Sequence, residues 1–154
     1  MIDVSFDCKI NFNKKDVSDF IIKSIYAILK ILKNKEDNFY ISILLTNNDK
    51  IRKINFQYRK IDKETNVLSF TQNEKRMLKE AKNHLILGDI VISIEKIISE
   101  AEQQKKIFWD HLSHMLIHSI LHLLGYDHEN KNDAIMMENK ERDIFTKLSE
   151  EKII

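Results

Sequence analysis

The chain has 154 residues, 43% of them hydrophobic, and a formal net charge of +1 at pH 7, which suits a single domain, residues 1–154, with one core. A net charge so close to zero does not by itself indicate a nucleic-acid or membrane partner, and the sequence has no run of about 18 apolar residues to span a bilayer. The single Cys8 excludes an internal disulfide, and the first residues lack an apolar signal core, so we expect a cytoplasmic protein.

Short strands and helices alternate along the chain. Strands are predicted at residues 1–7, 39–45, 67–70 and 85–94 from their alternating or β-branched apolar residues. Helices are predicted at about 14–33, from Thr46 or Asn47 to 58, from Ser93 or Glu95 to 104, at 108–124, and after Asn130 or Asn132, with polar segments at 34–38, 59–64 and 71–85. This order favours an α+β fold, in which five or six helices pack on a small mixed sheet of about four strands.

Charge is distributed unevenly along the sequence. Residues 50–82 carry ten basic and four acidic side chains, a local net charge of +6, whereas residues 127–151 carry four basic and eight acidic ones, a net of −4. The basic segment is able to face a polyanion, and the alternative is that it forms a solvated surface.

Three histidines at the end of the predicted central helix, residues 108–124, have the spacing of a metal site. In the stretch 118–128, H-S-I-L-H-L-L-G-Y-D-H, His118 and His122 lie one helical turn apart. Gly125 can end the helix in a left-handed conformation, which lets His128 fold back toward the first two imidazoles. Three converging imidazoles favour one transition-metal ion per chain, zinc in particular, although other divalent transition metals also bind imidazole. His114 lies a turn farther away, so a hydrogen-bonded or core role competes with a role in the site.

The same spacing occurs in the zinc-peptidase motif H-E-x-x-H-x-x-G-x-x-H, in which the glutamate is the general base. Ser119 stands at that position here, and its hydroxyl cannot act as this base near neutral pH. Asp127 is a nearby carboxylate that can serve as a base or orient a ligand imidazole, unless it only stabilises the turn. The residues therefore favour a metal hydrolase of another substrate class, with a metallopeptidase-like or other zinc hydrolase as the alternative.

The stretch 118–128 closely resembles the H-G-x-L-H-L-x-G-Y-D-H signature of the YbeY family, bacterial endoribonucleases that act as rRNA maturation factors. Tyr58-Arg59, Thr65–Phe70 and Leu87–Ser93 resemble other blocks of the family in the same order, so the likeness covers most of residues 55–128. Ser119 departs from the pattern, which has glycine there. We expect the metal site to survive this change, with an effect limited to the approach to the metal or the packing behind it.

The resemblance implies a zinc-dependent endoribonuclease in which His118, His122 and His128 hold the metal and Arg59 is catalytic. A guanidinium suits this role on chemical grounds, because it can pair with two phosphoryl oxygens that gain negative charge during cleavage. His114 and Asp127 are further catalytic candidates. The residues that we expect to contact RNA are Arg59, Lys60, Lys63, Lys75, Arg76 and Lys79.

The implied substrate is single-stranded rRNA precursor, chiefly the 3′ end of small-subunit rRNA, with roles in ribosome assembly and quality control. The ribosomal small subunit is the implied partner, and neither a membrane nor a nucleotide cofactor is expected. A second alternative is a non-enzymatic ribosome-assembly factor in which zinc only ties the helix to the turn. Structural zinc normally has four protein ligands, and Cys8 is the only thiol.

Overall fold

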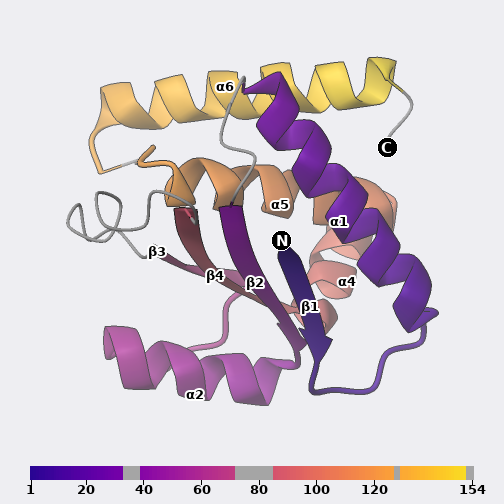
Figure 1. The fold of residues 1–154 in the computed structure, drawn as a ribbon. Helices are drawn as coiled ribbons and strands as arrows, with labels where there is room; N and C mark the ends of the chain where they lie inside the picture. The colour runs from indigo at the N-terminus through magenta and orange to yellow at the C-terminus, as the bar shows by residue number, and fades with distance from the viewer. Residues whose placement is uncertain (33–38, 72–84, 127–128, 152–154) are drawn as a thin grey trace.

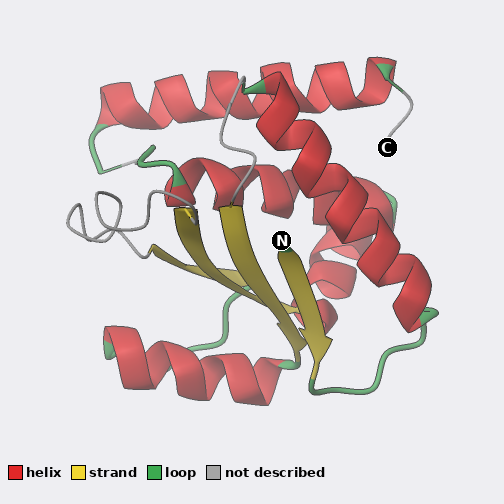
Figure 2. Cartoon of the chain, in the orientation of Figure 1, coloured by secondary structure: helices red, strands yellow, loops and turns green. Residues whose placement is uncertain are grey.

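The structure is a computed structural model that describes residues 1–32, 39–71, 85–126 and 129–151. Within these residues the chain forms the predicted α+β fold, with four strands and five helices (Figure 1, Figure 2). The strands are β1 (Ile2–Phe6), β2 (Phe39–Thr46), β3 (Val67–Thr71) and β4 (Leu85–Ser93). The helices are α1 (Lys14–Ile31), α2 (Asn48–Arg59), α4 (Ile94–Gln103), α5 (Phe108–Leu123) and α6 (Lys131–Glu150).

The four strands form one mixed sheet in the order β1-β2-β4-β3. β1 and β4 pair with β2 in parallel, and β3 pairs with β4 antiparallel, with Leu68 opposite Val91 and Phe70 opposite Asp89. The antiparallel edge strand β3 therefore begins near the end of β4. Helix α5, which carries the predicted histidines, contacts β3 directly.

The sheet separates two unequal layers of helices. Figure 1 shows α5 between the sheet and α6, with α1 beside it, while α2 lies on the opposite face. Ile90 and Ile92 of β4 point into the main core, which α1, α4, α5 and α6 share. Val91, between them in sequence, faces a smaller cluster with Ile51 of α2 and Leu68 of β3. The predicted alternation is confirmed at residues 90–92, because successive side chains there point to opposite faces. Leu87 also faces the main core, because the pairing with β2 skips it between Ile86 and Gly88.

Four of the five described helices begin at a polar side chain that accepts a hydrogen bond from the first turn. The capping residues are Asn13, Asn47, Ser93 and Asn130. Each satisfies a backbone N–H group that otherwise lacks a partner inside the helix. For three helices the sequence allowed either of two capping residues, and in the structure the caps are Asn47, Ser93 and Asn130. Helix α5 begins after Ile107 without such a cap, so its packing between the sheet, α1, α4 and α6 stabilises it instead.

Gly88 is where β3, β4 and the end of α5 meet. Its φ of +146° is unfavourable for residues with a side chain. A Cβ atom at this position would overlap the carbonyl oxygen of Phe70 and lie 2.8 Å from Cδ2 of Leu123. Only glycine therefore allows β3 and the C-terminal end of α5 to approach this closely.

The predicted boundary between α2 and the loop after it changes. Arg59, predicted to start a loop, is the last residue of α2, and the helix ends at Lys60 in a left-handed conformation with φ of 60°. The predicted polar segments 34–38 and 71–85 lie almost entirely outside the described residues. None of the described helices is long and apolar enough to cross a membrane.

Candidate metal centre and its hollow

Two of the three histidines of the predicted site, His118 and His122, project from the last turns of α5. This helix ends at Leu124, where the backbone N–H of Gly125 donates to His122 O and that of Tyr126 donates to Leu121 O, both at 3.0 Å. Gly125 has φ of +101°, as predicted for a left-handed helix end. The chain thus turns sharply at Gly125, three residues after His122. His128 and Asp127, which follow the turn, lie outside the described residues.

The imidazoles of His118 and His122 converge on one point. Their Nε2 atoms lie 3.1 Å apart, and their ring planes are inclined by 79°. Two imidazole nitrogens on a tetrahedral zinc ion, each about 2.0–2.1 Å from the metal, are separated by about 3.3 Å. The pair therefore fits two adjacent ligand positions of such an ion. Within residues 1–32, 39–71, 85–126 and 129–151, no three His, Cys, Asp or Glu side chains form a metal-binding group, so the three-ligand site stays a prediction that depends on His128.

Glu141 of α6 fixes the orientation of His118. Its Oε1 atom lies 2.5 Å from Nδ1 of His118, and its Oε2 atom lies 3.1 Å from Nε2 of His114. Burial raises the pKa of Glu141, but hydrogen bonds from His114 and His118 outweigh this effect and hold the pKa at about 2. The ionised carboxylate can only accept hydrogen bonds, so both histidines donate to it. Nδ1 of His118 then carries a proton, and in the neutral ring the lone pair of Nε2 faces His122, the arrangement that metal-binding histidines commonly have.

Sequence reasoning missed Glu141, although a signal was present. The buried residues of α6 are Met137, Ile144 and Leu148, and Glu141 lies between them at the same helical spacing of three or four residues. Its side chain is only 12% exposed. A carboxylate in the apolar stripe of a helix requires a buried partner, which the sequence offered in the histidines of α5.

Ser119, the residue that departs from the family pattern, points away from the histidine pair. It is fully buried, and its hydroxyl donates to the carbonyl of Met115 one turn earlier in α5, at 2.7 Å. The added hydroxymethyl group therefore lies in the packing behind the histidines, one of the two effects expected from the sequence.

Arg59 lies in the same hollow as the histidine pair. This hollow has a volume of about 1030 Å³, and its lining includes Arg59, His118 and His122. Nη2 of Arg59 donates to the carbonyl of Ser69 at 2.7 Å, and the guanidinium lies 5.1 Å from the ring centre of Phe70. Strand β3 thus holds the cation at the end of α2 in a defined position. The structure brings the two predicted halves of the site together across almost sixty residues of sequence.

The other predicted site residues either lie outside the hollow that contains Arg59 or fall outside the described residues. Lys60 and Lys63 are exposed in the turn after Arg59 and are not among the described residues that line the hollow. Lys75, Arg76 and Lys79 lie outside the described residues. His114 contacts the far side of Glu141 and lines two neighbouring hollows between α5 and α6, rather than the one with Arg59. Roles for these side chains in RNA binding or catalysis stay predictions.

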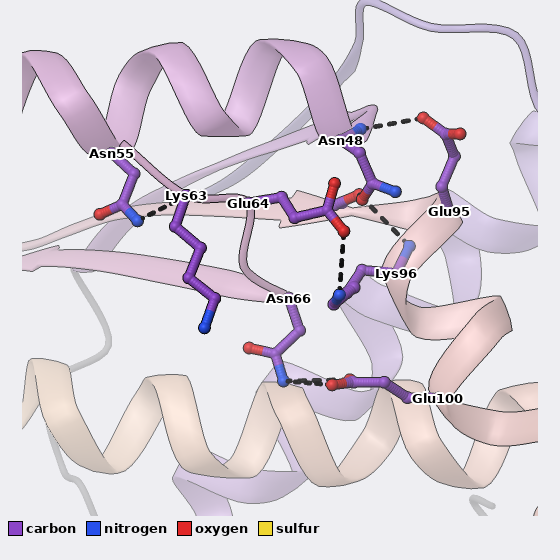
Figure 3. A network of polar contacts seen from close by, with 9 residues as sticks. Asn48, Asn55, Lys63, Glu64, Asn66, Glu95, Lys96 and Glu100 are labelled. Atoms are coloured by element: carbon purple, nitrogen blue, oxygen red, sulfur yellow. Dashed lines mark hydrogen bonds and ion pairs between the residues drawn. The ribbon is translucent and has the colours of Figure 1, made fainter. Parts of the chain in front are cut away.

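The connection from α2 to β3, residues 60–66, is held in place by polar contacts with two helices (Figure 3). Nδ2 of Asn55 donates to Lys63 O at 2.9 Å, and Nζ of Lys96 lies 3.0 Å from Oε1 of Glu64. Nδ2 of Asn66 donates to Oε1 of Glu100 at 3.0 Å. These contacts tie one wall of the hollow to α2 and α4.

His111 belongs to the same network. The residue is 2% exposed, and Nε2 of its ring lies 2.9 Å from Oε1 of Glu100, the atom that also binds Asn66. His111 therefore has a structural role. It supports the wall of the hollow from behind, without lining the hollow.

Comparison with known proteins places the chain in a family. The family model described as "Endoribonuclease YbeY" matches residues 5–149. Relatives of that name include a protein from Bartonella bacilliformis, 44% identical over 82% of this chain and 79% of its own length. Another is from Bartonella quintana, 38% identical over 96% of this chain and 92% of its own. A third, from a Wolbachia of Drosophila simulans, is 40% identical over 92% of this chain and 88% of its own.

The fold also has a solved counterpart. The solution structure of TM1509 from Thermotoga maritima superposes with a TM-score of 0.59, covering 99% of this chain and 95% of that one, at 22% sequence identity. At this identity the likeness supports the fold alone. The family match across nearly the whole chain, together with relatives at 38–44% identity, establishes that the chain belongs to the endoribonuclease YbeY family.

Proposed function

We propose that the chain is a zinc-dependent endoribonuclease that cleaves single-stranded RNA. The observation that carries the proposal is that the converging Nε2 atoms of His118 and His122 and the guanidinium of Arg59 line one hollow. An anion-binding cation beside a pair of metal-binding imidazoles suits cleavage of a phosphodiester. Relatives named "Endoribonuclease YbeY" support RNA as the substrate class.

His118 and His122, with His128 as the third ligand, would hold one metal ion per chain, with zinc as the first candidate among the transition metals that imidazoles bind. When bound, such an ion polarises the phosphoryl group and lowers the pKa of a water molecule. Glu141 contributes by fixing the ring of His118, which limits the motion of one ligand before the metal arrives.

Arg59 would pair with the phosphoryl oxygens that gain negative charge during cleavage. A guanidinium has five N–H donors, and the bond to Ser69 O uses one of them. The contacts with Ser69 and Phe70 restrict the side chain before substrate binds, so less conformational entropy is lost when the phosphate arrives.

The substrate that we propose is precursor rRNA, processed at the 3′ end of small-subunit rRNA during ribosome assembly and quality control in the cytoplasm. The ribosomal small subunit would be the partner, with no membrane or nucleotide cofactor involved. Support comes from the family relationship and from the local net charge of +6 in residues 50–82. Single strands are favoured because a base-paired backbone fits poorly into a hollow bounded by α2, β3 and the end of α5.

The test combines metal analysis with cleavage of a small-subunit rRNA precursor. Zinc content is measured by mass spectrometry in the wild type, Arg59→Glu, His122→Ala and a control, Lys53→Glu. Lys53 is exposed on the same helix as Arg59, and its substitution makes the same change of charge outside the lining of the hollow.

Arg59→Glu should retain zinc and lose cleavage by at least about 100-fold, because one preorganised group that stabilises the transition-state charge contributes roughly that much. His122→Ala should lose both zinc and cleavage, and Lys53→Glu should keep its zinc and lose far less cleavage than Arg59→Glu. Full cleavage by Arg59→Glu, or unchanged zinc in His122→Ala, would contradict the proposal.

The alternative of a metallopeptidase or another zinc hydrolase requires a carboxylate base. Glu129 lines the hollow, whereas Glu141 lies behind His118. Cleavage of peptides that His122→Ala abolishes, with RNA left intact, would favour this alternative. A non-enzymatic assembly factor would instead show a fourth protein ligand on the metal and no cleavage of either substrate.

A further inference from the structure

Tyr58 is an aromatic residue with an unusual degree of exposure beside Arg59. It is 65% exposed, although it belongs to the regular part of α2, and it lines the same hollow as Arg59 and the histidine pair. A single exposed aromatic ring is ordinary on a protein surface. The position of this one, within the hollow that holds the proposed reaction centre, is what requires an explanation.

The ring of Tyr58 is held in place by Phe70. The two ring centres lie 5.4 Å apart at an angle of 59°. The guanidinium of Arg59 lies 5.1 Å from the centre of the same Phe70 ring. One side chain of β3 therefore positions both an exposed aromatic ring and a cation that suits a phosphate group. The two come from consecutive residues, so a ligand that pairs with Arg59 passes close to Tyr58.

A second exposed aromatic residue lines the hollow from the end of α5. Tyr126, at the turn that ends α5, is 36% exposed and lines the hollow together with Gly125 and His122. Aromatic rings and a cation that line one hollow are the combination that binds single-stranded nucleic acids, in which bases stack on the rings and phosphates pair with the cation.

We propose that Tyr58, supported by Phe70, is a stacking subsite for one unpaired base of the RNA strand, next to the phosphate that Arg59 contacts. The inference rests on the proposed endoribonuclease function and adds the group that selects single strands. A base within a duplex is already stacked between its neighbours and paired, so its face cannot reach an aromatic ring. Stacking tolerates every base, so the subsite recognises the single strand rather than a particular base.

The chain contains a closely matched control for this residue. Tyr26 of α1 is 49% exposed, and its ring lies 5.5 Å from that of Phe39 at an angle of 62°. Its exposure and its aromatic neighbour are thus nearly those of Tyr58, but it is not among the residues that line the hollow. Any general effect of removing an exposed tyrosine should therefore appear equally in Tyr26→Ala.

The experiment measures the Kd of an unstructured RNA oligonucleotide by fluorescence anisotropy at low temperature, with gels to verify that the RNA stays intact. Tyr58→Ala should weaken binding about 5- to 100-fold, the range expected when one base loses its stacking partner. Tyr58→Phe, which keeps the ring, should have a Kd within about twofold of that of the wild type. Tyr26→Ala should have the same Kd as the wild type. Melting temperatures of the metal-loaded variants verify folding.

A second oligonucleotide series, in which one abasic nucleotide is moved along the strand, identifies the contact as stacking. For the wild type, an abasic nucleotide at one position should weaken RNA binding by about the same factor as Tyr58→Ala does. For Tyr58→Ala, an abasic nucleotide at that position should not weaken binding further. Equal Kd values for Tyr58→Ala and the wild type, or an abasic penalty that persists in the variant, would overturn the subsite and assign Tyr58 to another contact, such as one with a protein. Failure of the wild type to bind or cleave any RNA would instead refute the proposed function, and the subsite with it.

Discussion

From the contact between Glu141 and His118 we predict how much Glu141 of α6 contributes to the stability of the protein and to its affinity for zinc. Glu141→Ala removes two hydrogen bonds to an ionised carboxylate, one from His118 and one from His114. Each such bond contributes roughly 1.5–3 kcal/mol to the free energy of unfolding. Part of this free energy is recovered in the variant, because both imidazoles are partly exposed and can bind water instead. We expect a loss of about 2–4 kcal/mol in the unfolding free energy of the metal-free protein, or about 4–16 °C in Tm for a chain of this length.

Zinc affinity should fall as well. Loss of a carboxylate that orients a metal-binding histidine typically weakens binding about 10- to 100-fold. Glu141→Gln should give an intermediate loss, because an amide oxygen can accept from one histidine but its NH2 group cannot accept from the other. Competition with a chromophoric chelator measures the zinc Kd, and thermal unfolding measures stability. Glu138→Gln, an exposed change of the same charge on the same helix, is the control.

A spectroscopic measurement distinguishes an effect of Glu141 on the orientation of His118 from a general effect on stability. Nitrogen-15 NMR of the metal-free wild type should show the proton of His118 on Nδ1, and Glu141→Ala should show a mixture of tautomers. The reasoning is refuted if zinc affinity and the tautomer of His118 in Glu141→Ala equal those of Glu138→Gln.

Three other outcomes are expected. His122→Ala should bind less than about one tenth of the wild-type zinc at equal concentration, measured by mass spectrometry after dialysis; full occupancy would exclude His122 as a ligand. Gly88→Ala should lose roughly 2–5 kcal/mol of unfolding free energy, because a Cβ there overlaps Phe70 O. Gly125→Ala should lose only about 1 kcal/mol, because no atom lies within 4 Å of the added Cβ; equal losses in urea unfolding would argue against the overlap. Neutralising four predicted RNA-binding lysines should flatten the dependence of log Kd on log salt, by about 0.7 for each phosphate that the protein no longer neutralises; an unchanged slope would place the RNA elsewhere. These residues are Lys60, Lys63, Lys75 and Lys79.

Local signals in the sequence were enough to predict most of the elements. Capping residues such as Asn13 and Asn130 act on backbone groups within four positions, so their effect does not depend on the rest of the fold. The turn at Gly125 and the spacing of His118 and His122 are local in the same sense, because the geometry of one helix determines them. The family resemblance of these residues was confirmed by comparison across the chain.

The sequence did not reveal what surrounds the histidines. Glu141 reaches His118 from 23 positions away, because the main core pairs α5 with α6. Arg59 reaches the hollow because β3 pairs with β4 and Gly88 allows the close approach of β3 to α5. Such contacts depend on which elements pack together, which is decided by the burial of apolar faces from distant parts of the chain. The sequence by itself determined the helix that carries the histidines, and the tertiary structure decided which carboxylate orients them and which cation and aromatic ring share their hollow.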